Sequence, residues 1–106
     1  MEGIIYKYTS PTGKVYIGQT LDEERRRTEF LNEDVRYAGK RIENARHKYG
    51  PENFKYEILE RKEYRTIEEA LYDLNLMESY YIGVFDSYKN GYNMTYGGEG
   101  VRGMVF

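Results

Sequence analysis

The sequence predicts an α/β domain in which a small three-stranded antiparallel β-sheet is flanked by three main helices. Two short aromatic and β-branched segments joined by turn residues stand near the start, and a third alternating segment, residues 54–58, stands mid-chain. Segments with helical signals follow the second and the third of these. Because 106 residues bury one modest core, we expect residues 1–106 to form a single domain, with 90–106 as a Gly-rich C-terminal tail.

The first two segments predict a β-hairpin. Residues 3–9 and 14–19 are rich in tyrosine and isoleucine, and residues 10–13, Ser-Pro-Thr-Gly, carry the chemistry of a tight turn. The two strands should therefore pair directly.

Two helices are expected after the hairpin. Residues 20–23 have the form of a capping box, and neither glycine nor proline follows until Gly39, so the first helix should run from about Leu21 to Arg36. The second should run from Lys40 to Tyr49 and end at Gly50, which acts as a C-cap.

The third helix has the clearest pattern. Residues 66–69 form a second capping box, and we expect a helix from Ile67 to about Gly83. Its apolar residues recur at intervals of three and four: Ile67, Ala70, Leu71, Leu74, Met77 and Tyr81. Residues 90–106 lack such periodicity, which predicts a loop.

The composition limits the kinds of metal site and cross-link that the chain can form. The chain has no cysteine and one histidine, His47, so disulfides and thiolate zinc sites are excluded and a bound metal should have mainly oxygen ligands. Neither a membrane-length apolar run nor a signal-peptide pattern is present, so we expect a cytoplasmic protein without a membrane partner.

The charge is unevenly distributed. The net charge of -2 gives no overall attraction to nucleic acid, but residues 25–48 carry eight Lys and Arg against four Asp and Glu. This stretch is the expected phosphate-facing surface, and a solvated pair of mixed-charge helices is the alternative.

Four side chains could carry chemistry. Glu78 lies on or beside the apolar stripe of the third helix, where a carboxylate needs a positive partner such as Mg²⁺, or else extends to water or pairs with an arginine. Tyr6 and Tyr16 could project from one side of the hairpin toward one pocket, or form a stabilising aromatic pair. Arg26 could hold a phosphodiester, or belong to a solvated face.

Taken in order, these residues resemble the GIY-YIG nuclease family. The GIIY of residues 3–6 is similar to its first motif with one residue inserted, YIG of residues 16–18 matches its second, and NGYN of residues 90–93 is similar to its closing motif. Arg26 and Glu78 fall where the family has its arginine and its metal-binding glutamate. The string of residues 14–20 and the Gly-rich ending look most like homing endonucleases.

The resemblance implies a divalent-metal-dependent endonuclease that hydrolyses DNA phosphodiester bonds. Glu78 would hold Mg²⁺ or Mn²⁺, Tyr6 would orient or deprotonate the attacking water, and Arg26 would stabilise the developing charge. Tyr16 would hold the phosphate or the water shell of the metal. Tyr37 would occupy a place where some relatives have an assisting histidine, or be structural.

The resemblance also implies positions for the substrate. Asn93 would tie the tail across the site or act as a turn residue, and a side chain at Gly18 would crowd the approaching phosphate. The expected substrate-binding residues are Gly18, Arg25, Arg27, Lys40 and Arg41. A separate DNA-binding domain or partner chain would supply specificity, because so small and acidic a module should bind weakly.

One residue departs from the pattern. Four positions after Arg26 the family usually has a polar His or Tyr, whereas this chain has Phe30. A catalytically impaired nucleic-acid-binding domain of the same fold is therefore one alternative, and a repair-type incision nuclease module is another.

Overall fold

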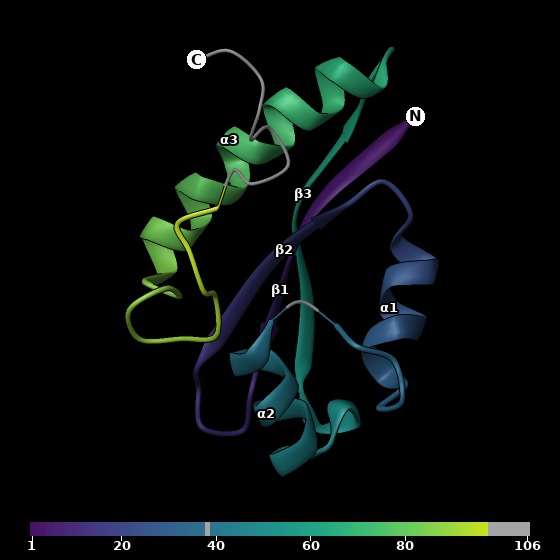
Figure 1. The fold of residues 1–106 in the computed structure, drawn as a ribbon. Helices are drawn as coiled ribbons and strands as arrows, with labels where there is room; N and C mark the ends of the chain where they lie inside the picture. The colour runs from purple at the N-terminus through teal and green to yellow at the C-terminus, as the bar shows by residue number, and fades with distance from the viewer. Residues whose placement is uncertain (38, 98–106) are drawn as a thin grey trace.

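The computed structural model describes residues 1–37 and 39–97, and it has the predicted fold (Figure 1). In chain order the elements are β1 (Glu2–Thr9), β2 (Val15–Thr20), α1 (Glu23–Leu31), α2 (Lys40–Tyr49), the 3-10 turn η1 (Pro51–Asn53), β3 (Lys55–Glu63) and α3 (Ile67–Phe85).

The three strands form one antiparallel sheet in the order β2-β1-β3. In the predicted hairpin, Tyr8 lies opposite Tyr16 and Tyr6 lies opposite Gly18. The pairing of β1 with β3 is irregular at Tyr6, because Ile5 faces Glu60 whereas Tyr6 faces Ile58. β2 and β3 are the edges, so the hairpin leaves the outer side of β2 available to the C-terminal segment.

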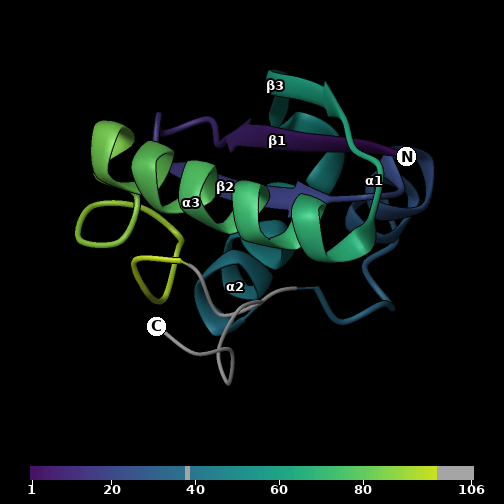
Figure 2. The same cartoon turned by 90° about the horizontal axis from the view of Figure 1, so that it is seen from above.

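Each face of the sheet has its own core. The tyrosines of β1 and β2 share one face with Ile4 and pack with residues of α1 and α2, among them Phe30 and Ile42, and with Phe54. The opposite face presents Ile5 and Ile17 to α3, which runs along the strands beside β2 (Figure 2). Tyr6, Tyr8 and Tyr16 therefore gather on the face away from α3.

The first helix is shorter than predicted. It ends at Leu31 rather than Arg36, because Asn32 has an extended backbone and the chain then turns toward α2. Its N-cap is Asp22 rather than Thr20, since an Asp22 carboxylate oxygen accepts a hydrogen bond from Arg25 N at 3.2 Å.

The remaining bounds agree more closely. α2 spans Lys40–Tyr49 and ends at Gly50, which has φ +82, as predicted. α3 begins at Ile67 with Thr66 as its N-cap, and it extends two residues beyond Gly83 to a left-handed cap at Asp86. β3 continues to Glu63, past the predicted residues 54–58, because the eight-residue β1 supplies partners along its whole length.

Residues 87–97 form no helix or strand, as predicted for the tail, whereas the rest of that predicted loop, 98–106, lies outside the described residues. Among the described residues, no helix combines the length and hydropathy required to cross a membrane.

Candidate active site

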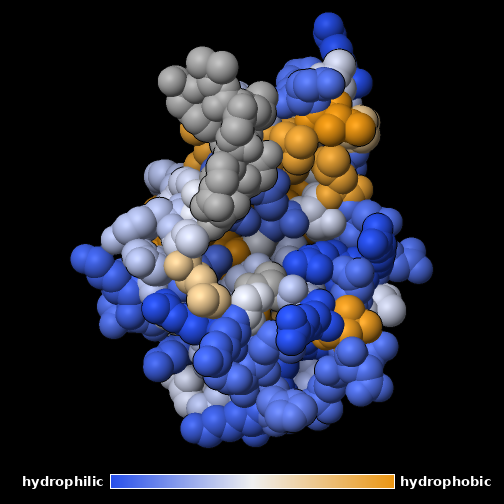
Figure 3. All heavy atoms as spheres, viewed as in Figure 1, coloured by the Kyte–Doolittle hydropathy of each residue, from blue (hydrophilic) through white to orange (hydrophobic). Residues whose placement is uncertain are grey.

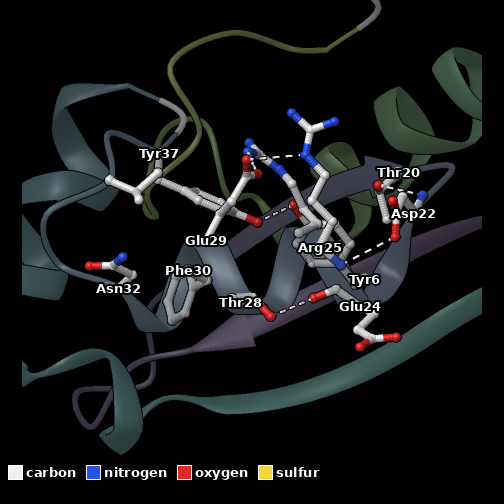
Figure 4. A network of polar contacts seen from close by, with 12 residues as sticks. Tyr6, Thr20, Asp22, Glu24, Arg25, Thr28, Glu29, Phe30, Asn32 and Tyr37 are labelled. Carbon is white, nitrogen blue, oxygen red and sulfur yellow. Dashed lines mark hydrogen bonds and ion pairs between the residues drawn. The ribbon is translucent and has the colours of Figure 1, made fainter.

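Tyr6 and Arg26 meet at Tyr37. The Tyr6 and Tyr37 hydroxyls are hydrogen-bonded to each other (Figure 4), and Cζ of Arg26 lies 3.8 Å from the centre of the Tyr37 ring. Tyr37 precedes α2 by three residues, and its backbone N–H donates to the Glu43 carboxylate of that helix. A strand, a helix and a loop thus bring together two phenols and a guanidinium.

Gly18 makes room for Tyr6. The Tyr6 ring crosses the neighbouring strand so closely that a Cβ on Gly18 would lie 2.4 Å from both Cζ and Oη of Tyr6. From the sequence, a glycine is expected here to leave room for a phosphate. In the structure the Tyr6 ring fills that space, so the ring itself requires the glycine. Tyr16 lies on the same face, with its ring centre 6.4 Å from that of Tyr6, so the two phenols project from one side of the sheet, as predicted.

Glu78 approaches this cluster from α3. Its carboxylate is close enough to raise the pKa of both Tyr6 and Tyr16 through its charge, after burial, which is the largest cause for both. A Cβ on Gly97 would lie 3.1 Å from Oε1 of Glu78, so the tail passes beside the carboxylate. Although α3 covers the other face of the sheet, Glu78 lies on the same side of the molecule as Tyr6 and Arg26.

Burial keeps the tyrosines protonated. It raises the pKa of Tyr6, Tyr16 and Tyr37, and the positive charge of Arg26 only partly offsets this increase. Near neutral pH these side chains are phenols that can donate and accept hydrogen bonds. Because the Tyr6 phenol holds its proton, it is better suited to orient a water molecule than to deprotonate one.

Asn93 joins the tail to the outer edge of β2. Its Oδ1 accepts from Ile17 N and its Nδ2 donates to Ile17 O, each at 2.9 Å. One side chain thus satisfies both backbone groups of an edge-strand residue, as a neighbouring strand would. The tail is tied down as expected, and Asn93 is a buried structural tie beside the tyrosine cluster.

The predicted phosphate-binding cations do not share one surface. Arg25 is exposed and pairs with Glu29, whereas Arg27 lies over the Tyr56 ring, 4.3 Å from its centre, toward β3. Lys40 is exposed at the start of α2. Arg41 donates from Nη1 to the carbonyl of Asn93 at 2.8 Å, so it also holds the tail.

Arg46 lies within residues 25–48, the expected phosphate-facing stretch, but the prediction is wrong for this residue. Its side chain is buried, with 1% of the residue exposed, and it donates to the carbonyls of Glu29, Phe30, Asn32 and Val35 and to the Glu43 carboxylate. These contacts bind carbonyls at and just beyond the end of α1, and they fix the chain that leads to Tyr37. Sequence periodicity could have revealed it, since Arg46 follows Ile42 by one helical turn on the buried face of α2.

Phe30, which departs from the motif, is a core residue. Its ring is stacked on Tyr8 with centres 3.6 Å apart and meets Tyr37 edge-on at 5.2 Å. It therefore supports Tyr37 by packing and offers no polar atom to a substrate.

A cleft of about 400 Å³ opens beside Arg26. Its walls come from the end of β2, the start of α1 and α3, with Leu21 and Leu71 as apolar surfaces. Next to it, Nε2 of Gln19 donates to Oδ1 of the buried Asn75 at 2.7 Å, which joins β2 to α3. Sequence reasoning missed this pair, because a polar residue within an apolar stripe is indistinguishable from an exposed one until its partner is known.

A metal would find few protein ligands here. Within the described residues, no group of three or more His, Cys, Asp or Glu side chains could hold an ion. Glu78 supplies one half-buried carboxylate beside phenolic oxygens. This oxygen-only set fits Mg²⁺, which commonly keeps several waters and uses one or two carboxylates together with substrate phosphate oxygens.

Solved structures share this architecture. The catalytic domain of intron endonuclease I-TevI, in a mutant form, superposes with a TM-score of 0.66 over 90% of this chain and 95% of that domain, at 24% identity. A second structure of the catalytic domain of homing endonuclease I-TevI gives 0.64 over 88% and 98%, at 23% identity. The chain has the fold of a homing-endonuclease catalytic domain. The fold that the sequence resemblance implies is thereby confirmed.

A curated relative is also similar in sequence. "Putative endonuclease segE" of Enterobacteria phage T4 is 37% identical over 102 residues, which cover 94% of this chain. The chain spans 44% of the length of that relative. No protein-family model matches the chain.

Proposed function

We propose that the chain is the catalytic module of a divalent-metal-dependent DNA endonuclease. The observation that carries the proposal is the packing of Arg26 on Tyr37, which is hydrogen-bonded to Tyr6, with the charge of Glu78 acting on the Tyr6 and Tyr16 phenols. The names of the phage relative and of the I-TevI domain, both endonucleases, support the same activity.

The reaction is hydrolysis of a phosphodiester. Arg26, held against Tyr37, donates to non-bridging oxygens and offsets the charge that accumulates on the phosphorus group. Tyr6 accepts a hydrogen bond from the attacking water while its hydroxyl is oriented by Tyr37. Tyr16 donates to the phosphate or to a water beside it.

Glu78 would hold the metal. When bound, Mg²⁺ or Mn²⁺ polarises the phosphate and lowers the pKa of coordinated water. Glu78 also places a negative charge beside two buried phenols, and a cation at its carboxylate would offset the resulting increase in their pKa.

Specificity would come from elsewhere. The phage relative extends well beyond the region matched here, and a DNA-binding segment in such an extension, or in a partner chain, would compensate for the weak binding of a module of net charge -2. A cytoplasmic location stays a prediction from the sequence.

Plasmid nicking tests the proposal. The wild type and its Glu78→Ala and Arg26→Ala variants are incubated with supercoiled plasmid, with and without Mg²⁺. A matched control is Glu68→Ala, which removes an exposed carboxylate from the same helix. We expect Mg²⁺-dependent nicking by the wild type and Glu68→Ala alone, and equal nicking by all four proteins would contradict the proposal.

The buried Phe30 favours one alternative, an impaired domain that binds DNA without cutting it. Such a domain would retain plasmid equally with and without Mg²⁺ and leave it supercoiled. The Phe30→His variant would then be the informative comparison, since it restores a polar group at the position where the motif usually has one. The repair-type incision alternative stays a prediction from the sequence.

A further inference from the structure

Two adjoining hollows lie between the hairpin turn, α2 and the tail. They measure about 410 and 270 Å³. Lys14, Arg41, Asn44 and Tyr92 line both hollows. Because they share these residues, the two hollows form one continuous depression. The segments around it, the hairpin turn, α2 and the tail, are distant in the sequence (Figure 1).

The lining of this depression is strongly basic. Lys89 lines the first hollow and Lys48 lines the second, in addition to Lys14 and Arg41. We call these four cations the basic surface. Among the described residues, neither hollow is lined by Asp or Glu. The nearby Asp86 accepts a hydrogen bond from Asn90 and lines neither hollow. Figure 3 shows that mostly hydrophilic residues cover the lower part of the molecule in that view.

The backbone around the depression is held in place. Tyr92 N donates to Val15 O at 2.9 Å, and the Tyr92 hydroxyl donates to Ser10 Oγ at 2.8 Å. With the Asn93 tie to β2 and the Arg41 contact to the Asn93 carbonyl, these bonds fix the tail against the hairpin. The fold thus holds like charges together without carboxylates in the lining, an arrangement that an anionic partner would stabilise.

We propose that the basic surface binds the sugar-phosphate backbone of duplex DNA that flanks the cleaved bond. The choice of DNA as the ligand rests on the proposed endonuclease function. Asn93 links the two regions, because its carbonyl is held by Arg41 and its side chain by Ile17, the neighbour of both Tyr16 and Gly18. The tail thus connects the basic surface to β2, the strand that carries Tyr16. Arg41 and Lys48 of this surface belong to residues 25–48, the expected phosphate-facing stretch, whereas Lys14 and Lys89 lie outside it.

The experiment measures binding separately from cleavage. Every protein carries Glu78→Ala to prevent cutting, and fluorescence anisotropy gives the association constant for a labelled duplex from low to moderate salt. The test variant is Lys14→Ala/Lys89→Ala, which leaves the tail-holding Arg41 intact. The control, Lys62→Ala/Arg65→Ala, removes the same charge from the opposite end of the molecule, where β3 leads into α3.

Each lost phosphate contact should reduce the slope of log K against log salt by roughly 0.9, so the test variant should lose about 1.8. The control should keep the slope of its Glu78→Ala parent. Equal slopes for the test and control variants, or no duplex binding by the parent even at low salt, would overturn the proposal. Binding that depends on Lys14 and Lys89 in a protein whose wild type nicks no plasmid would uphold this surface and refute the endonuclease function instead.

Discussion

The hydroxyl of Tyr37 is hydrogen-bonded to that of Tyr6, a residue 31 positions earlier in the chain. This contact connects the central strand of the sheet to the loop before α2. It also places the Tyr37 ring under Arg26, so one side chain positions both a phenol and a guanidinium.

Replacing Tyr37 by phenylalanine should therefore affect both stability and cleavage. The Tyr6 hydroxyl would lose its partner inside the protein, at a cost of about 1–3 kcal/mol if no water replaces it. We expect slower single-turnover cleavage, with a smaller loss than for Tyr6→Phe, which removes the hydroxyl proposed to orient the attacking water. Cleavage at the wild-type rate by a Tyr37→Phe protein would show that the contact is structural only.

The close approach of Tyr6 to Gly18 predicts a sharp effect of one methyl group. Gly18→Ala places a Cβ against the Tyr6 phenol, so the ring must move, and we expect a loss of about 1–3 kcal/mol together with most of the activity. Gly83→Ala is the control, because no atom lies within 4 Å of its added Cβ and the change favours a helix by roughly 0.5–1 kcal/mol. Chemical denaturation of both variants measures the contrast, and a Gly18→Ala protein as stable as the wild type would contradict the observed packing.

Arg46 should be one of the most sensitive positions in the chain. Truncation to alanine leaves five buried or half-buried acceptors without the Arg46 donor. We expect the unfolding free energy to fall by at least about 3 kcal/mol. Arg46→Lys should recover little, since an ammonium cannot reproduce the planar fork. Arg65→Ala, an exposed counterpart, should change the unfolding free energy by less than about 0.5 kcal/mol. Similar unfolding free energies for the two alanine variants would be inconsistent with the buried network.

Alkaline pH should destabilise the fold. Burial raises the pKa of Tyr6, Tyr16 and Tyr37 above the ordinary value of 10.0, so the unfolded chain loses these protons first. Their contribution is present below pH 10 and falls as the pH rises toward the folded pKa values, by roughly 1.4 kcal/mol per pH unit for each tyrosine. Denaturation at successive pH values should show this decline, and Tyr16→Phe should make it shallower. A stability that does not change between pH 10 and 11 would contradict the assigned burial.

Much of the fold is encoded locally and was predictable. The hairpin, the second helix and the start of the third follow from turn residues, caps and periodicity, which act over a few positions. The early end of α1 could not be predicted from local sequence. It depends on Arg46, 14 residues later, which donates a hydrogen bond to the carbonyl of Asn32. The strand order and the length of β3 likewise depend on pairing with β1.

The arrangement of the candidate site depends on contacts that the sequence could not show. The motif resemblance named Tyr6, Tyr16, Arg26 and Glu78, and the structure brings them to one side of the molecule. Their catalytic roles stay predictions. Short-range patterns could not show that the Tyr6 ring itself requires Gly18, since that contact depends on strand register.

The most direct test of the account is a double-mutant cycle between Arg26 and Glu78. Single-turnover cleavage rates in Mg²⁺ are measured for the wild type, Arg26→Lys, Glu78→Gln and the double variant, with melting temperatures as the check on folding. If both side chains act on one phosphodiester, the double variant should be little slower than the slower single variant. Losses that multiply independently, with all four proteins equally folded, would contradict a shared site.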